Sequence, residues 1–249
     1  MNVVNQLLGY NKFDIVQNTQ MFSFSLDSIL LPGFITINKK TKKILDIGTG
    51  NAPIPLILST MTDAKIIGVE IQKGAYELAK KSIEINKLND QIDIINGDIL
   101  DVIKNYETDS FDIITCNPPY FKVNKDANFN QSEYKTIARH EVFLNIEDVI
   151  KISKKLLKNN GLLGLVHRPE RLCEIIMLLE KYNLEPKKLQ FVYSKRNSNA
   201  NIILIEAKKN GNTGLKIVKP LYVHEDNGEY SKQVKDFFER GQKDVAEKL

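Results

Sequence analysis

The segment Asn117-Pro118-Pro119-Tyr120 combines residue types that suit the binding of a planar amine. Its two prolines fix a rigid turn and carry no backbone N–H, so the turn offers mainly carbonyl groups, and the Asn117 side chain adds an amide oxygen as a further acceptor. An aromatic ring such as that of Tyr120 can stack on a nucleobase that has left its own stack. This motif is the strongest chemical signal in the chain.

An amino group conjugated to a base ring is a poor nucleophile. Hydrogen bonds from its two protons to the Asn117 side chain and the Pro118 carbonyl would draw the nitrogen toward tetrahedral geometry and aim its lone pair at an electrophilic methyl group. Such a transfer needs no covalent enzyme intermediate. We therefore predict that Asn117, Pro118, Pro119 and Tyr120 form the catalytic motif.

A glycine-rich turn precedes this motif at Asp46-Ile47-Gly48-Thr49-Gly50. Glycines allow the backbone to turn tightly and to approach a ligand that a Cβ would exclude. Glu70 follows about 20 residues after the glycines, where an acid can accept hydrogen bonds from both ribose hydroxyls. Taken together, the turn and Glu70 are compatible with either S-adenosylmethionine or NAD.

Asp46 distinguishes between these two cofactors. A carboxylate at this position suits the amino-acid end of S-adenosylmethionine, whereas it would repel the pyrophosphate of NAD. Asp98, after the third strand-like run, provides an acceptor for an adenine amino group, although an acid there can equally cap a helix. We predict S-adenosylmethionine as the cofactor, bound by Asp46, Gly48, Thr49, Gly50, Glu70, Ile71, Asp98, Ile99 and Asn117.

Short apolar runs alternate with amphipathic stretches along the chain. The runs predict strands at 44–47, 66–69, 92–95, 111–115, 162–166, 189–193 and 202–206, and helical spacing predicts helices at 72–86, 146–158 and 170–181. Continuous apolar runs suit strands that are covered by helices on both faces, and strand–helix alternation predicts a doubly wound sheet. Ser194 to Asn201 is too short for a crossover helix, so the last two strands should form an antiparallel hairpin.

This pattern resembles the class I methyltransferase fold, an α/β, Rossmann-like architecture. We expect a mostly parallel seven-stranded sheet with a C-terminal antiparallel hairpin in one domain spanning residues 1–249. Residues 42–207 would form the catalytic core, 1–41 an N-terminal extension and 208–249 a C-terminal tail. We further expect Asp27 to cap a helix through Ile29 and an amphipathic helix at 231–247.

The composition is that of an ordinary globular protein: 249 residues, 42% hydrophobic, with a formal net charge of +4. No apolar run approaches the length of a membrane span and no secretory signal is evident, so we expect a cytoplasmic protein and no membrane partner. Cys116 and Cys173 are interpreted as packed core thiols. His140, His167 and His224 lack zinc-like spacing to them, so we predict no metal. A monomer is the default expectation.

The residues also resemble a known family. The glycine turn, Glu70, Asp98 and Asn117 to Tyr120 are similar to the amino-methyltransferases as a class. Further segments resemble the bacterial methyltransferases that modify the adenosine adjoining the anticodon of a valine tRNA: 22–31, 138–141, 168–171 and 214–230. The resemblance implies transfer of a methyl group to N6 of that adenosine, with Phe24 and Asp27 near the cofactor. Ala52 stands where many members have a third glycine.

Six basic side chains are candidate tRNA contacts around the mouth of the site. They are Arg139, His140, Arg168, Arg171, Lys195 and Arg196. An ordinary exposed charge is an equally good interpretation of each one taken singly.

Other functions stay open on the sequence alone. The same motif serves enzymes that methylate a protein glutamine, a ribosomal RNA guanine or a DNA adenine, although residues 1–42 are short for the helical domain of a protein methylator and no large DNA-recognition insert is evident. An NAD-dependent oxidoreductase would leave Asp46 and Asn117 unexplained. A catalytically silent RNA-binding module would not need Asn117.

Overall fold

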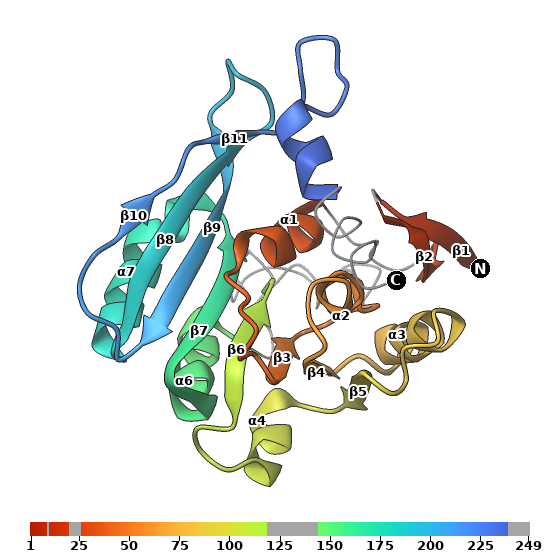
Figure 1. Ribbon diagram of the computed structural model, residues 1–249, viewed down its shortest axis with the longest axis horizontal. Helices are drawn as coiled ribbons and strands as arrows, with labels where there is room; N and C mark the ends of the chain where they lie inside the picture. Colours follow the sequence, from red (N-terminus) through yellow and green to blue (C-terminus); the bar gives the residue numbers. More distant parts are fainter. Residues whose placement is uncertain (9, 20–25, 119–143, 239–249) are drawn as a thin grey trace, which may run out of the picture.

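A nine-stranded sheet forms the centre of the molecule (Figure 1). The computed structural model describes residues 1–8, 10–19, 26–118 and 144–238. Each of the seven predicted strands is present with somewhat longer bounds: β3 (Lys43–Ile47), β4 (Lys65–Glu70), β5 (Ile92–Asn96), β6 (Phe111–Cys116), β7 (Leu157–His167), β8 (Leu184–Tyr193) and β9 (Ala200–Lys209).

These seven strands lie in the order β8-β9-β7-β6-β3-β4-β5. The pairs among β7, β6, β3, β4 and β5 are parallel, whereas β9 is antiparallel to both β7 and β8. The doubly wound sheet and its terminal hairpin are therefore confirmed. Two short strands not included in the seven expected, β10 (Lys216–Ile217) and β11 (Leu221–Tyr222), pair in parallel with β8 and widen the sheet at that edge.

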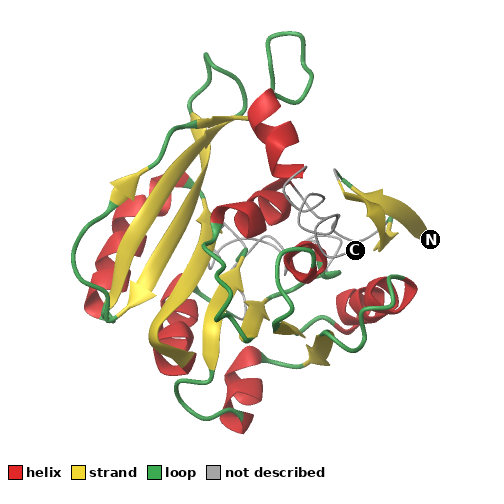
Figure 2. Ribbon diagram, in the orientation of Figure 1, coloured by secondary structure: helices red, strands yellow, loops and turns green. Residues whose placement is uncertain are grey.

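Helices cover both faces of the sheet (Figure 2). They are α1 (Leu26–Phe34), α2 (Pro53–Ser59), α3 (Lys73–Ile85), α4 (Ile99–Val102), α6 (Ile146–Leu156) and α7 (Leu172–Lys181), with 3₁₀ turns η1 (Ile103–Asn105) and η2 (Pro169–Arg171). Neighbouring strand residues point to opposite faces: Ile44 joins the core under α1 and α2, and Leu45 joins the core under α6 and α7. The three predicted helices are confirmed, and the second ends at Leu156 because β7 begins at once.

The N-terminal segment forms a strand pair that the sequence did not indicate. Strands β1 (Asn2–Leu7) and β2 (Tyr10–Asn18) are antiparallel and lie apart from the large sheet, beside α3 (Figure 1). Side chains from the core complete the hydrogen bonds of β2: Ser82 Oγ accepts from the Val16 N–H at 3.0 Å, and Asn51 Nδ2 donates to the Val16 carbonyl at 3.0 Å. The pair is thus fastened to α3 and to the turn before α2.

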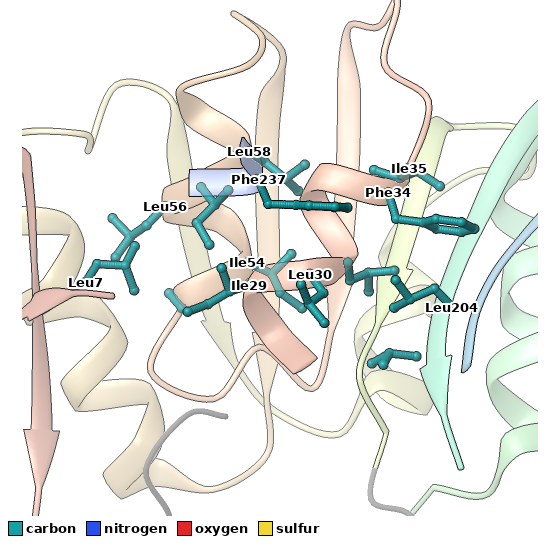
Figure 3. Close-up of a cluster of buried hydrophobic side chains, with 14 of the residues drawn as sticks. Leu7, Ile29, Leu30, Phe34, Ile35, Ile54, Leu56, Leu58, Leu204 and Phe237 are labelled. Atoms are coloured by element: carbon teal, nitrogen blue, oxygen red, sulfur yellow. The ribbon is translucent and has the colours of Figure 1, made fainter. Parts of the chain in front are cut away.

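Helix α1 packs against the core cluster that contains Ile44 of β3. It begins at Leu26, so Asp27 lies in its first turn rather than at the capping position that we expected. Residues 232–238 are helical, and Phe237 lies in the same core cluster as Leu30 of α1 (Figure 3). Its ring lies so close to Gly33 that a Cβ added to this glycine would collide with it. The remainder of the predicted 231–247 helix lies outside the described residues.

Cys173 contradicts its interpretation as a packed core thiol, because it is exposed. The buried positions of α7 are Ile175 and Leu179, four residues apart. Cys173 stands two residues before Ile175, which is about 200° of rotation around a helix, and so it faces away from the core. Among the described helices, none is long and apolar enough to cross a bilayer.

Candidate functional site: a cofactor turn beside a transfer motif

The glycine turn is held against the end of the neighbouring strand. The N–H groups of Gly48 and Thr49 both donate to the Val69 carbonyl, at 2.9 and 3.0 Å. Gly48 and Gly50 have φ values of 68° and 59°, in the left-handed region that glycine adopts without a steric penalty. A Cβ built on either glycine meets no atom within 4 Å, so there is open space beside the turn. The turn therefore leaves the open space that the predicted ligand site requires.

Ala52 also adopts a left-handed conformation, with φ 70° and ψ 36°, and it is buried. An L-residue with a Cβ pays about 1 kcal/mol for this conformation. The backbone at this position is therefore the one that glycine provides in many members of the resembled family, and the alanine retains it because its N–H donates to the Thr49 carbonyl at 2.9 Å.

Asp46 lies directly beneath the turn and has no exposed surface. Its Oδ1 accepts a 2.7 Å hydrogen bond from Thr115 Oγ1. Burial raises the pKa of Asp46 to about 7, and the Glu70 charge adds to the rise, while the nearby Thr49 and Thr115 hydroxyls lower it. Within the described residues neither Asp46 Oδ2 nor Thr49 Oγ1 has a hydrogen bond of good geometry. A cation at the turn would stabilise the charged carboxylate.

Glu70, at the end of β4, closes the turn from the other side. Its Oε2 accepts from the Gly50 N–H at 2.9 Å and its Oε1 from the Gln72 N–H at 2.8 Å. Burial raises the pKa of Glu70, and these backbone hydrogen bonds oppose that rise. Each carboxylate oxygen has a second lone pair that can accept from a hydroxyl group. Ile71 follows with 37% of its surface exposed, so an apolar side chain lies next to this acid at the surface.

Asp98 caps α4, since its Oδ1 accepts from the Leu100 N–H at 2.8 Å. Of the two roles that the sequence left open for Asp98, helix capping therefore occupies one carboxylate oxygen. Asn96 Nδ2 donates to the Glu70 carbonyl at 2.8 Å and so joins the ends of β4 and β5. Ile99 is buried, whereas Leu100 is 40% exposed. Acids and exposed apolar side chains therefore alternate along this edge, a combination that suits a sugar with a flat ring attached.

Asn117 follows β6 and lies beside the glycine turn. Ile47 of β3 and Cys116 of β6 are paired in parallel register, so the next residues, Gly48 and Asn117, leave the same edge side by side. Asn117 Nδ2 donates to Ser28 Oγ of α1 at 2.9 Å, and Pro118 is buried. Cys116 is buried as expected, and burial together with the Asp46 charge holds its thiol pKa well above the usual value, which disfavours a nucleophilic role.

Several predicted site residues lie outside the described residues. They are Phe24, Pro119, Tyr120, Arg139 and His140. Asp27 is described and is buried in the first turn of α1.

The remaining basic candidates differ in their surroundings. Arg171 makes a bidentate ion pair with Glu174, at 3.0 and 2.8 Å, and only 11% of its side chain is exposed. Arg168 donates to the Asn201 carbonyl at 2.8 Å. Lys195 and Arg196 are exposed in the β8–β9 loop. The Arg196 guanidinium lies 5.6 Å from the centre of the Tyr222 ring.

The sequence did not indicate the roles of Ser28 and Thr115. Thr115 is the residue of β6 that pairs with Asp46 in the parallel register, so a correct alignment of the two strands would have identified it. Ser28 adjoins Asp27 within a segment that carries the family resemblance, and the resemblance gave it no role of its own.

A family model described as a methyltransferase domain matches residues 38–183 of the chain. A tRNA1(Val) (adenine(37)-N6)-methyltransferase of Porphyromonas gingivalis is 32% identical over 192 residues, which are 74% of this chain and 73% of the relative. The enzyme of the same name from Flavobacterium psychrophilum is 27% identical over 82% of this chain and 92% of the relative.

Solved structures share the fold. A predicted O-methyltransferase of Agrobacterium tumefaciens superposes with a TM-score of 0.67 at 19% identity, covering 87% of this chain and 96% of that one. A tRNA m1G37 methyltransferase of M. jannaschii superposes with a TM-score of 0.58 at 18% identity, covering 85% of this chain and 57% of that one.

Proposed function

Because the chain belongs to the family of the bacterial tRNA1(Val) (adenine(37)-N6)-methyltransferases, we propose that it methylates the N6 amino group of an adenosine in tRNA, next to the anticodon of a valine tRNA. The observation that carries this proposal is the register of β3 and β6, which brings Gly48 of the cofactor turn beside Asn117 of the transfer motif. A methyl donor and an amine acceptor held at these two positions would meet at one edge of the sheet.

The residues around the turn fit S-adenosylmethionine. When bound, this cofactor supplies an electrophilic methyl group on a sulfonium. Asp46 is fully buried beneath the turn and would act as the counter-charge for the ammonium of the amino-acid end. The ammonium would in turn stabilise the charged form of the carboxylate. Glu70 would accept the ribose hydroxyls, and Asp98 would accept the adenine amino group with the oxygen that does not cap α4. Ile71 and Leu100 supply apolar surface for the adenine ring.

Asn117 and the Pro118 carbonyl would hold the two protons of the target amine. The two acceptors turn the nitrogen lone pair toward the cofactor side of the site, and Tyr120 would stack on the extruded base. The protein then contributes to catalysis by positioning the amine, since none of these groups has to form a covalent bond to the substrate. The buried, protonated Cys116 has no part in this transfer.

The β8–β9 loop is a good candidate for contact with tRNA. Strand β8 runs parallel to β7 and β6, so its C-terminal end and the loop after it lie at the same edge of the sheet as Asn117. Tyr222 lies between Arg196 and Tyr193, whose ring centre is 5.4 Å away. Rings and an arginine of this kind suit the stacking of unpaired bases.

Lys195 and Arg168 would add phosphate contacts at the same edge. Arg139 and His140 lie outside the described residues and stay candidates on the family resemblance alone. Arg171 is the weakest of the six candidates, because its guanidinium is already paired with Glu174.

We also propose that the enzyme acts as a monomer in the cytoplasm and needs no metal. Both cysteines are free thiols, which fits a reducing compartment. Size-exclusion chromatography with light scattering would test the monomer, and activity in the presence of a chelator would test the absence of a metal.

The test of the proposed function is methyl transfer from labelled S-adenosylmethionine to four substrates: unmodified total tRNA, ribosomal RNA, DNA and a glutamine-containing peptide. We expect label in tRNA only, recovered as N6-methyladenosine, and none with Asn117→Ala. Labelling of another substrate in place of tRNA would support the methyl-transfer site and refute the assignment of tRNA as the substrate. Preferential binding of NAD over S-adenosylmethionine would refute the cofactor.

A further inference from the structure

We propose that Ser28 is a positioning residue for the transfer motif: its hydroxyl fixes the orientation of the Asn117 side-chain amide. The inference deepens the proposed function and rests on it. The observation is the 2.9 Å hydrogen bond from Asn117 Nδ2 to Ser28 Oγ, which joins two segments 89 residues apart in the chain.

The orientation of this amide decides whether the motif can bind an amine. A carboxamide carries its donor nitrogen and its acceptor oxygen on opposite sides of one carbon atom. While the nitrogen donates to Ser28, the oxygen faces the other way and can accept a proton from the target amino group. If the amide turned over, it would present its NH₂ group to an amine that is itself a donor there, and the two would repel each other. In the structure Ser28 Oγ accepts from the nitrogen, and this hydrogen bond holds the amide in the arrangement that presents its oxygen to the target.

Ser28 is well placed to do this because it is held rigidly. It is 6% exposed and lies in the first half of α1. The far end of α1 is fixed to the sheet: the Phe34 carbonyl accepts from Lys188 Nζ at 2.9 Å, and the Thr36 N–H donates to Glu206 Oε2 at 2.6 Å. Lys188 and Glu206 are themselves an ion pair at 3.0 Å. A hydroxyl on such a helix restricts the amide more than a mobile side chain would.

The principal variant is Ser28→Ala, which removes the acceptor and keeps a residue that favours helices. We expect the single-turnover rate of methyl transfer, at saturating tRNA and cofactor, to fall about tenfold, the effect of losing one hydrogen bond. The dissociation constants for S-adenosylmethionine and for tRNA should stay within twofold of the wild type. Ser28→Thr keeps the hydroxyl and should restore most of the rate.

Ser153→Ala is the matched control. Ser153 is likewise a buried serine within a helix, and its hydroxyl donates to the Val149 carbonyl on the other face of the sheet. Its rate should equal that of the wild type. A Ser28→Ala rate within twofold of the wild type, or a Ser28→Thr rate as low as that of Ser28→Ala, would overturn the positioning role.

A second measurement does not depend on catalysis. The two side-chain N–H signals of Asn117, assigned in an ¹⁵N spectrum by their loss in Asn117→Ala, should shift in Ser28→Ala and return toward the wild-type positions in Ser28→Thr. Unchanged signals in Ser28→Ala would refute the hydrogen bond. If the wild type methylates no tRNA, the proposed function fails, and the spectrum still decides whether Ser28 orients Asn117.

Discussion

Asp46 and Thr115 face each other across two parallel strands, and the Thr115 hydroxyl donates to the Asp46 carboxylate at 2.7 Å. This is the one oxygen of Asp46 with a hydrogen bond of good geometry among the described residues. A buried acid that is only partly satisfied makes the folded protein sensitive to pH, and the sensitivity can be measured.

Asp46→Asn should remove a contribution to stability that decreases as the pH rises. Burial raises the folded-state pKa of Asp46 to about 7, from an ordinary value of 3.8. The folded state therefore binds this proton more tightly, and the stability it contributes is full below pH 3.8 and is lost as the pH rises through 7, by on the order of 4 kcal/mol. Urea unfolding without cofactor, at steps from pH 5 to 8, should show the stability of the wild type relative to the variant fall by roughly 3 kcal/mol, the part of this loss that lies above pH 5. Parallel curves for the two proteins would contradict the prediction.

His167 should act in the opposite direction. Burial, reinforced by the Arg171 charge, lowers the pKa of His167 to about 4. Because the unfolded state takes up the proton first, the stability from this group is present above pH 6.5 and is lost as the pH falls toward 4, by roughly 3 kcal/mol. The His167 ring signals in an NMR titration should stay those of a neutral imidazole at pH 5.5. A midpoint near 6.5 would show that the ring is not buried as described.

Glu70→Gln should weaken binding of S-adenosylmethionine by roughly ten- to a hundredfold, because hydrogen bonds to a charged group contribute about 1.5–3 kcal/mol. The amide would also set an NH₂ group against one of the two backbone N–H groups, of Gly50 or Gln72, that the carboxylate now accepts from. Isothermal titration calorimetry measures the change. Glu84→Gln, an exposed position on α3, is the control and should bind like the wild type. Equal affinities of Glu70→Gln and the control would remove Glu70 from the cofactor site.

Arg196→Ala and Tyr222→Ala should each weaken tRNA binding several-fold and leave cofactor affinity unchanged. If Arg196 contacts a phosphate, the slope of log affinity against log salt should fall by about 1, whereas loss of the Tyr222 ring should leave the slope unaltered. Fluorescence anisotropy at several salt concentrations separates the two effects. Lys104→Ala, an exposed lysine paired with Asp101 beyond α4, serves as the control. Wild-type affinity in both variants would exclude the β8–β9 loop from the tRNA interface.

The sheet was predictable because its signals are local. Runs such as Ile202 to Ile205 are apolar on consecutive positions, and this pattern is typical of a strand that is covered on both faces. The glycine turn, Glu70 at the end of β4 and Asp98 after β5 follow from the same strand assignments. Cys173 was misplaced because the rotation of a helix depends on where it begins, and the 3₁₀ turn at 169–171 sets the start of α7 at Leu172.

The strand pair at the N-terminus was not predictable from its own residues. Some of its hydrogen-bond partners are side chains far away in the chain: Ser82, Asn86 and Asn51 bond to the backbone of β2, and none of them belongs to a sequence pattern that indicates this role. Ser28 is a similar case, since its bond to Asn117 depends on how α1 crosses the sheet and not on either local sequence.

The contact between Gly33 and Phe237 has a consequence for how the molecule is made. The apolar surface of α1 next to Gly33 is covered by the ring of Phe237, a residue that is synthesised about two hundred residues later. This contact can therefore form only after the chain has emerged from the ribosome as far as Phe237. Until then the helix that carries Ser28 is open on one side. The nascent chain can assemble much of its sheet during synthesis, but the Phe237 cover over α1 forms only after the segment 232–238 has been made.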